Sequence, residues 1–387
     1  MYSKSLKLFL AGIVLTLQAA CMAPGFLKHT NLRAPLEGLK VGDIVKTSTG
    51  EVITYDSLTT ELAHAKVIYV VESHTSAEDH RVQLRIMRGL YSQNPSLILA
   101  LEMFPREAQP LLDEYAKGSI SEEEFLKEVK WDNIWGYPFR LYSDILTRAK
   151  DHRIEIVGLN APGMIVRKIA RSGLSSLTAS ERERVAQDFH TNDPAHQEYI
   201  RRQYHQHLKD NITDFNTFYE AQLAWEETMA ETLAQVMASH VPEEQIIVLV
   251  GKGHISDRVG LPELTLKRVE HTYRTIAPIP VDYPGSTADS RIADFVWITD
   301  SSQPGHRVRL GAKFRQLPSG KGLEILDVLP DSPAAKAGIK NGDVLYRVDG
   351  KPINNIEEVR RAFSNKMVHE LTLKRGDRAF SVTVTFR

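Results

Sequence analysis

The sequence predicts an α/β protein with a mostly parallel sheet, flanking helices and a helical insertion, followed by a smaller α+β domain. Short apolar runs rich in β-branched residues alternate with longer segments of helical periodicity, which is typical of parallel strands joined by helices. The strand runs are almost continuously apolar, as expected for strands buried on both faces. They lie at 67–71, 97–101, 154–159 and 246–250.

Polar residues follow these strand runs at the point where each run ends. Glu72 and His74 follow the first run, Glu102 the second, Asn160 the third and His254 the fourth. In an open α/β sheet the ligand crevice lies beyond the carboxyl ends of the strands. Two imidazoles and two carboxylates there suit a divalent metal or a general acid and base. We therefore take Glu72, His74, Glu102 and His254 as candidate catalytic or metal-binding residues; solvated strand ends are the alternative.

A long helical region separates the third strand run from the fourth. Residues 199–208 and 215–240 carry apolar side chains at helical spacing. The stripe includes Phe218, Trp225 and Met229. We interpret this stripe as core packing rather than as a cofactor site.

The composition narrows the possible ligands. Forty-eight basic and 49 acidic side chains give a net charge of −1, whereas a nucleic-acid-binding protein needs a clustered basic excess. We therefore expect no nucleic-acid partner. A single cysteine allows neither an internal disulfide nor a four-cysteine metal site. Any metal or haem must be held by His, Tyr, Met or carboxylate side chains.

The first twenty residues have the pattern of a secretion signal. Lys4 and Lys7 precede an apolar run at 8–17, and two alanines at 19–20 provide a cleavage point. The run is shorter than the about 20 apolar residues of a membrane span. The only cysteine, Cys21, follows directly, which resembles a bacterial lipoprotein signal. We expect lipidation at Cys21; plain secretion with an incidental thiol is the alternative.

The C-terminal region closely resembles a PDZ domain of the bacterial, protease-associated type. The resemblance rests on the segment LEILDVLPDSPAAKAGIKNGDVLYRVDGKPI, residues 323–353. A PDZ domain offers a strand edge to which a peptide adds, and a loop of backbone N–H groups that holds the peptide's carboxylate. By this resemblance the loop comprises Arg309, Leu310, Gly311 and Ala312. A docking or dimerising module without a peptide ligand is the alternative.

The α/β region resembles the ChaN-like haem-binding uptake family of the Tiki, TraB and erythromycin-esterase superfamily. Five motifs in this order carry the resemblance: VESHTSAEDHRVQLRIMRGL, LEMFPREAQPLLDEY, WDNIWGYPFRLYSDIL, LNAPGMIVRKIAR and GKGHI. It implies a bacterial, lipid-anchored, iron-regulated protein that binds haem as a homodimer, with haem between the protomers. It also implies that a tyrosine holds the haem iron, and that basic residues and histidine contact the propionates.

The motifs leave the haem ligand open among three tyrosines. Tyr142 lies in the aromatic segment WGYPFRLY, and Tyr199 and Tyr219 lie in the helical insertion. For each of them the alternative is a buried ring whose hydroxyl bonds locally. Charge-assisted hydrogen bonds suit propionates, and the candidates for that role are His80, Arg81, Arg140 and Lys168.

Three functions remain open at this stage. The first is a haem-binding protein of iron uptake whose PDZ domain recruits a partner. The second is a metal-dependent hydrolase or protease using Glu72, His74, Glu102 and His254, with the PDZ domain delivering a peptide. The third is an envelope adaptor without catalysis. The hydrolytic branches of the superfamily carry Gly-x-x-His twice, and Val71 replaces the glycine of the first motif, which argues against retained hydrolase activity.

These patterns divide the chain into five parts. We expect a signal peptide (1–20), a linker (21–41), the haem-binding α/β domain (42–284), a connecting segment with one apolar strand (285–305) and the PDZ domain (306–387). Met22 follows the cysteine where inner-membrane lipoproteins carry Asp. We therefore expect an outer-membrane protein facing the periplasm.

Overall fold

The structure, a computed structural model, describes ten stretches of the chain. They are 33–190, 193–207, 214–255, 259–283, 287–289, 291–300, 310–317, 320–330, 332–363 and 368–385. The predicted signal peptide, Cys21 and Arg309 lie outside these stretches. Within them, no helix combines the length and the apolar character that crossing a bilayer requires.

An eight-stranded sheet in the order β3-β2-β10-β8-β4-β7-β5-β6 forms the centre of the first domain. Six neighbouring strands run parallel, which confirms the predicted mostly parallel sheet. They are β10 (Phe295–Thr299), β8 (Tyr273–Pro280), β4 (Val67–Glu72), β7 (Gln245–Gly251), β5 (Leu97–Pro105) and β6 (Glu155–Asn160). The four predicted strand runs correspond to β4, β5, β6 and β7.

The remaining two strands form an antiparallel hairpin at one edge. β2 (Ile44–Lys46) pairs with β10 and with β3 (Glu51–Ile53). The helix α1 (Tyr55–Leu62) follows, capped by the Thr54 side chain. The hairpin and the helix precede β4 in the chain.

The sheet includes a strand that the sequence places in a connecting segment. β10 lies between β2 and β8, and all five of its residues are buried. Its apolar side chains need cover on both faces, so residues 295–299 belong to the α/β domain rather than to a connection. The predicted N-terminal linker likewise contributes β1 (Arg33–Pro35), which pairs with β9 (Thr287–Asp289).

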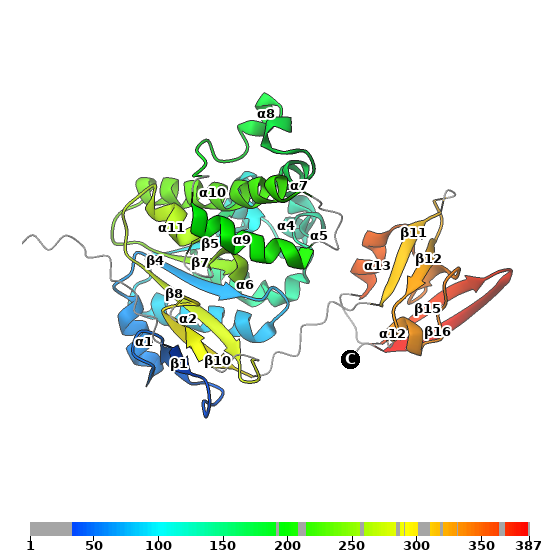
Figure 1. Cartoon of the computed structure of the whole chain (residues 1–387), viewed down its shortest axis with the longest axis horizontal. Coiled ribbons are helices and arrows are strands. Elements are labelled where there is room, and N and C mark those ends of the chain that lie inside the picture. Colours follow the sequence, from blue (N-terminus) through cyan, green and yellow to red (C-terminus); the bar gives the residue numbers. More distant parts are fainter. Residues whose placement is uncertain are drawn as a thin grey trace, which may run out of the picture.

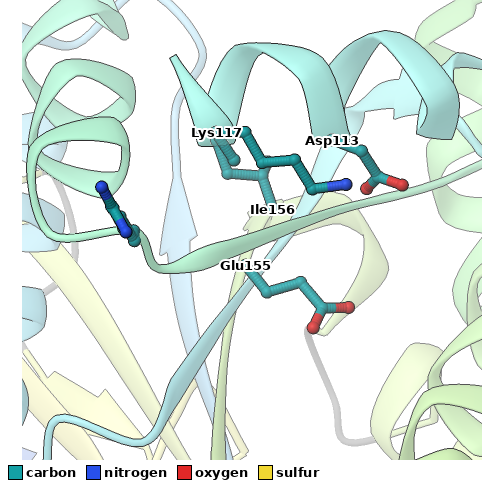
Figure 2. A pocket seen from close by; sticks show the side chains of 6 residues that line it. Asp113, Lys117, Glu155 and Ile156 are labelled. Atoms are coloured by element: carbon teal, nitrogen blue, oxygen red, sulfur yellow. The ribbon is translucent and has the colours of Figure 1, made fainter. Parts of the chain in front are cut away.

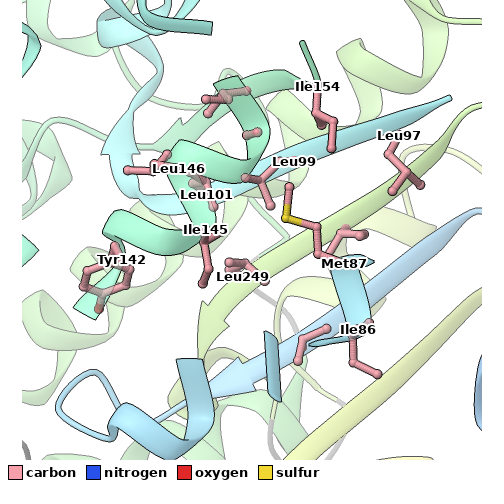
Figure 3. Close-up of a cluster of buried hydrophobic side chains, with 14 of the residues drawn as sticks. Ile86, Met87, Leu97, Leu99, Leu101, Tyr142, Ile145, Leu146, Ile154 and Leu249 are labelled. Carbon is pink, nitrogen blue, oxygen red and sulfur yellow. The ribbon is translucent and has the colours of Figure 1, made fainter. Parts of the chain in front are cut away.

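Helices cover both faces of the sheet, because successive strand residues point to opposite sides. Ile68 and Val70 of β4 belong to one buried cluster, whereas Val67 and Tyr69 belong to another. Figure 3 shows part of the first cluster, including Met87 and residues of β5. The helices of that face are α1, α2 (Ala77–Gln93), α3 (Gln109–Lys117), α4 (Glu122–Val129), α5 (Trp131–Ile134) and α6 (Ser143–Asp151).

The predicted helical insertion lies between β6 and β7 and packs on the other face. Figure 1 shows α7, α10 and α11 grouped on one side of the sheet, with α8 projecting beyond them. Phe218, Met229 and Leu233 of α10 are buried, as expected for a core-packing stripe. The helices are α7 (Gly163–Ser172), α8 (Ala179–Arg182), α9 (Pro194–His207), α10 (Phe215–Ser239) and, after β7, α11 (Leu261–Leu266).

Four short 3₁₀ turns connect these elements in the described stretches. They are η1 (Arg106–Ala108), η2 (Phe139–Leu141), η3 (Leu174–Ser176) and η5 (Lys252–His254). η5 carries the candidate site residue His254, and η2 carries the candidate propionate partner Arg140.

The C-terminal domain is an antiparallel sheet with two helices and its own buried core. The strands β11, β12, β13, β15 and β16 follow in this order, and β14 pairs with β13. Their bounds are Ala312–Gln316, Leu323–Val328, Val344–Val348, Val368–Arg375 and Arg378–Thr385, with β14 at Lys351–Pro352. The helices are α12 (Pro333–Lys336) and α13 (Ile356–Phe363).

Candidate functional site

Four neighbouring strands of the sheet end at one edge and carry polar side chains there. β4 pairs with β7, β7 with β5, and β5 with β6, all in parallel. Glu72 ends β4 and Asn160 ends β6, while His254 lies in η5 directly after β7. Glu102 lies in β5 beside them. The structure therefore brings together the residues that the sequence places at strand ends.

Glu72 is a buried carboxylate with a complete set of partners. Its Oε1 lies 2.8 Å from His74 Nδ1 and accepts a 2.8 Å hydrogen bond from the Tyr142 hydroxyl. Its Oε2 accepts from Gln83 Nε2 at 2.8 Å and lies 3.4 Å from His80 Nδ1. Burial opposes ionisation of Glu72, but the imidazoles of His80 and His74 outweigh burial and lower its pKa to about 2.

A second set of buried side chains centres on His254. Its Nε2 lies 3.4 Å from Glu102 Oε1, and its Nδ1 lies 2.9 Å from Glu226 Oε1. Burial disfavours the charged imidazole, but the two carboxylates outweigh burial and raise the pKa of His254 to about 10. Burial also opposes ionisation of Glu102 and Glu226, yet the adjacent histidines lower the pKa of each carboxyl. The two carboxylates thus favour the protonated form of the buried His254 imidazole.

The chain of partners continues into the helical insertion. The other oxygen of Glu226, Oε2, lies 2.7 Å from His196 Nε2. His196 Nδ1 in turn lies 3.2 Å from the Tyr219 hydroxyl. Glu226 is fully buried and His196 is 1% exposed. Carboxylates and imidazoles therefore alternate from the strand ends to helices α9 and α10.

His74 connects the two sets of side chains. A Cβ atom added at Gly251 would lie 2.6 Å from His74 Cε1 and 3.3 Å from Glu102 Oε2, so the imidazole packs directly on the strand end. Burial lowers the basicity of His74, but the carboxylates of Glu72 and Glu102 outweigh burial and raise its pKa. The His74 ring packs on Trp135 and Tyr137, whose ring centroids lie 4.8 and 4.9 Å away.

Two buried polar atoms flank the Glu102–His254 pair without a partner among the described residues. Asn160 donates from Nδ2 to the backbone carbonyl of Glu102 at 2.8 Å, which leaves its Oδ1 unpaired. The indole N–H of Trp225 is also unpaired, and the Trp225 ring lies 5.3 Å from the His254 ring. Unsatisfied buried polar atoms are rare in folded proteins. Both atoms offer hydrogen bonds to a ligand or water at the strand ends.

Sequence reasoning missed Glu226 and His196. Glu226 stands inside the apolar stripe of α10, between Trp225 and Met229, and we interpreted that stripe as core packing only. One signal could have indicated it: two acidic residues, 226 and 227, lie within the apolar segment AWEETMA. Charged side chains are almost never fully buried without a partner, so acidic residues there indicate a buried partner. Nothing in the sequence around His196 indicates that it faces this carboxylate.

In the C-terminal domain, the predicted carboxylate-binding loop precedes the edge strand β11. Leu310 and Gly311 use their carbonyl oxygens internally, since they accept from the N–H groups of Ala334 and Leu329, each at 2.8 Å. No described residue accepts a hydrogen bond from the N–H of Leu310 or of Gly311. Ala312 begins β11. Two adjacent N–H groups thus remain available to an anion at this loop.

A surface pocket of about 480 Å³ lies at the opposite end of the main sheet. Figure 2 shows Asp113 and Lys117 of α3 near Glu155 and Ile156 at the start of β6; Arg153 also lines the pocket. The strand-end residues lie at the other end of the same strand, where Asn160 ends β6. Because its lining combines two cations and two carboxylates without an aromatic ring, this pocket does not suit a porphyrin.

The family model described as haem-binding uptake, Tiki superfamily, ChaN matches residues 58–264, more than half of the chain. This chain belongs to the ChaN family. A solved structure that describes cofacial haem binding to ChaN of Campylobacter jejuni covers 66% of this chain and 96% of that chain. The TM-score is 0.54 at 20% identity, so this likeness supports the fold alone. The resemblance that the five motifs carry is confirmed.

A PDZ-domain model matches residues 324–375, which confirms the predicted PDZ domain. The serine protease HTRA1 of Xenopus laevis is 34% identical over 64 residues, 16% of this chain and 14% of that protein. The putative serine protease HhoA of Synechocystis sp. is 43% identical over 72 residues, 18% of each chain. This chain therefore spans less than a fifth of these relatives, and their protease activity does not transfer to it.

Within the ChaN-family domain, the three candidate tyrosines have different surroundings. Tyr142 is 2% exposed, and its hydroxyl accepts from Trp135 Nε1 and donates to Glu72. Burial and the charge of Glu72 raise the Tyr142 pKa. The Tyr219 hydroxyl lies beside His196 in the interior of the insertion. Tyr199 is 7% exposed, as Tyr219 is, but its hydroxyl donates to the backbone carbonyl of Gly253 at 2.8 Å, next to His254.

The candidate propionate partners do not form a cluster. His80 is 4% exposed and faces Gln83 and Glu72 in the interior. Arg81 is exposed and pairs with Glu78 of the same helix turn. Lys168 pairs with Glu181 at 2.6 Å, and Arg140 is exposed. Burial therefore removes His80 from the surface that a propionate reaches, whereas the three cations remain at the surface.

The alternative of a divalent metal at Glu72, His74, Glu102 and His254 is not supported. Across the described stretches, no group of three or more His, Cys, Asp or Glu side chains is arranged to hold a metal ion. The physical reason is that these side chains bind each other. Glu72 engages His74, and both ring nitrogens of His254 face carboxylates.

Proposed function

We propose that the α/β domain binds haem at the strand ends for iron uptake, and that the PDZ domain docks the C-terminus of a partner. The match of residues 58–264 to a haem-binding family carries this proposal. The matched region includes every residue of the strand-end network.

The residues present at the strand ends suit one face of a porphyrin. Trp135 and Tyr137 pack on the ring of His74, whose side chain is 24% exposed. Aromatic rings supply flat apolar contact area. The unpaired atoms of Asn160 and Trp225 add hydrogen-bonding capacity nearby. Tyr137 is partly exposed beside the buried Trp135. We propose a homodimer that shares haem between its protomers, as the cofacial binding of the Campylobacter relative suggests.

Among the three candidates, we propose Tyr199 as the residue that holds the haem iron. A tyrosine phenolate is one of the axial ligands that haem iron takes in proteins. Releasing the Tyr199 hydroxyl breaks a hydrogen bond to the backbone carbonyl of Gly253. Releasing Tyr142 instead removes a donor from the buried Glu72 carboxylate and leaves Trp135 unpaired, which is more costly.

Haem titration of the purified full chain tests this function. We expect saturable binding of haemin with a shifted Soret band, and we expect Tyr199→Phe to lose the spectral bands of a phenolate ligand. Tyr91→Phe is a matched control, because Tyr91 lies on α2 and packs on His152. Absence of saturable binding would overturn the haem proposal and leave a non-catalytic envelope adaptor. An unchanged spectrum of Tyr199→Phe would overturn only the ligand assignment.

We further propose that lipidation of Cys21 anchors the protein to the outer membrane, facing the periplasm. The support is the order of charged start, apolar run, small pair and cysteine in residues 1–21. In cells, Cys21→Ser should move the protein from the membrane fraction to the soluble fraction, while Cys21→Ser protein should still bind haem. Unchanged membrane association of the variant would contradict the anchor.

A further inference from the structure

The PDZ domain presents a free edge with two chemically different faces. Among the described strands, β11 pairs only with β12, so its other side has no strand neighbour. Ala312 and Phe314 face the domain core, where they pack on the buried cluster. Lys313 and Arg315 point to the opposite face and are exposed. The irregularity in this pairing places an extra residue on β12, so the alternation along β11 is unbroken.

The loop before β11 determines the direction of an added peptide. The unused N–H groups of Leu310 and Gly311 lie at the amino end of β11. A peptide whose terminal carboxylate binds there runs antiparallel to β11 as it adds to the edge. Residues directly opposite each other in an antiparallel pair share a face. In the register that sets the last peptide residue opposite Ala312, the last and third-last peptide residues face the side of Ala312 and Phe314, towards the apolar cluster that includes Phe363 of α13.

The same register places the other peptide residues beside cations. The penultimate residue lies next to Lys313 and the fourth-last residue next to Arg315. Arg315 is partly neutralised, because its guanidinium bonds Glu324 of β12 at 2.6 Å. Lys313 stands opposite Asp327 in the register, but no described residue lies within ion-pair distance of its ammonium group. Of the two cations on β11, Lys313 is thus the one that is more available to a peptide.

We propose that this PDZ domain selects C-terminal peptides that carry an acidic residue at the penultimate position, with a weaker acidic preference at the fourth-last position. This inference rests on the proposed docking function and specifies its partner. An opposite-charge pair between neighbouring strands favours such a peptide about two- to five-fold over a neutral one. A like-charge pair disfavours a lysine peptide by a similar factor.

Fluorescence anisotropy with the full chain tests this selectivity. The probes are three labelled decapeptides that end in valine and differ only at the penultimate position, which is Glu, Gln or Lys. We expect the Glu peptide to bind tightest and the Lys peptide weakest. The difference should shrink as sodium chloride rises from 50 mM to 500 mM, because exposed charges are screened.

Charge reversal at β11 provides the decisive comparison. Lys313→Glu should invert the order of the Glu and Lys peptides and leave the Gln peptide within about two-fold. Arg378→Glu reverses a charge on the opposite edge strand, β16, where Arg378 is exposed. This control should leave the order of the peptide affinities unchanged. Equal affinities for the three peptides, or an unchanged order in Lys313→Glu, overturn the selectivity while docking stands. If no peptide binds, both the docking function and the selectivity fail.

Discussion

Glu226 holds His196 and His254 together: its two oxygens lie 2.7 Å from His196 Nε2 and 2.9 Å from His254 Nδ1. These histidines come from α9 and η5, and Glu226 comes from α10. One buried carboxylate therefore attaches the helical insertion to the end of the central strand β7. The surroundings of the strand ends thus depend on how the insertion docks.

Replacing this carboxylate with an amide should weaken the fold markedly. In Glu226→Gln, an amide N–H₂ group faces an imidazole that was held as a cation, and no charge compensates His254 on that side. Breaking a buried ion pair by removing one partner costs about 3–5 kcal/mol. We expect a loss of this size in the free energy of unfolding, measured by urea denaturation of the apo protein.

An exposed pair of the same chemistry provides the control. Glu155 lies 3.0 Å from His240 Nε2, and its side chain is 44% exposed. Solvent-exposed ion pairs contribute about 0–1 kcal/mol, so Glu155→Gln should change the unfolding free energy by no more than that. Equal losses of unfolding free energy in the two variants would contradict the argument that the buried Glu226 pairs stabilise the fold more than an exposed pair does.

His74 packs so closely on Gly251 that no side chain fits at residue 251 without a shift. In Gly251→Ala the new methyl group would lie 2.6 Å from His74 Cε1 and 2.9 Å from its Nε2. The imidazole or the end of β7 must therefore move, and overpacking of this kind costs about 1–3 kcal/mol. We expect a lower midpoint of urea unfolding, together with a displaced His74 imidazole resonance in NMR spectra.

Gly253 tests whether this effect is specific to the position. Among the described residues, a Cβ atom at Gly253 meets only the flexible end of Gln203, at 3.7 Å. Gly253→Ala should therefore shift stability by less than about 1 kcal/mol and leave the His74 resonance in place. A comparable shift in both variants would contradict the packing argument.

The strand ends were largely predictable because each depends on local sequence. Apolar runs that stop at Glu72, Glu102 and Asn160 indicate buried parallel strands, and parallel strands end at the same edge. The position of β10 was not predictable in the same way. The run 295–298 indicates a strand, but its neighbours β2 and β8 are about 250 and 20 residues away in the chain.

The network beyond His254 was not predictable from these patterns. Helical periodicity assigns Trp225 and Met229 to a buried face, but it does not indicate which side chains that face meets. Glu226 finds its partners His196 and His254 about 30 residues away on either side. Such pairings depend on how α9 and α10 dock. Docking is set by tertiary contacts, and no local sequence pattern indicates it.

Acid should weaken the fold through Glu72. Its pKa is lowered to about 2 in the folded chain, compared with about 4.3 in an unfolded chain. A depressed carboxyl pKa contributes stability that is complete above the unfolded value and is lost as the pH falls through the folded value. We expect Glu72 to account for a loss of about 2.5 kcal/mol between pH 5 and pH 2, measured by denaturation at each pH.

Comparison of two glutamine variants isolates the Glu72 contribution. Glu72→Gln should be less stable at pH 7 and should have a flatter stability profile between pH 5 and pH 2. The pKa of Glu181 is also lowered to about 2, chiefly by its hydrogen bond from Lys168. Because this pair is open to solvent, water and salt screen it, and Glu181→Gln should leave the profile close to that of the unmodified chain. If Glu72→Gln left the dependence of stability on pH unchanged, Glu72 would not be the source of the acid-dependent loss.

In the PDZ domain, Gly311→Ala should abolish peptide binding. Gly311 has a φ of 73°, and a Cβ atom there would lie 2.2 Å from the Cβ of Ser332. Ser332 caps α12 by accepting from the N–H of Ala335 at 3.1 Å, so the added methyl group displaces both the helix cap and the loop with the unused N–H groups. We expect at least a tenfold loss of affinity for a valine-terminated peptide in anisotropy titrations.

Gly338→Ala separates this clash from the cost of the backbone conformation. Gly338 has a similar φ of 75°, but nothing lies within 4 Å of a Cβ atom there. The substitution therefore costs only the left-handed conformation, about 1–2 kcal/mol, and should lower the thermal midpoint while affinity stays within about two-fold. If both variants lose affinity equally, destabilisation explains the loss. If only Gly311→Ala does, the loop at 310–311 holds the peptide carboxylate.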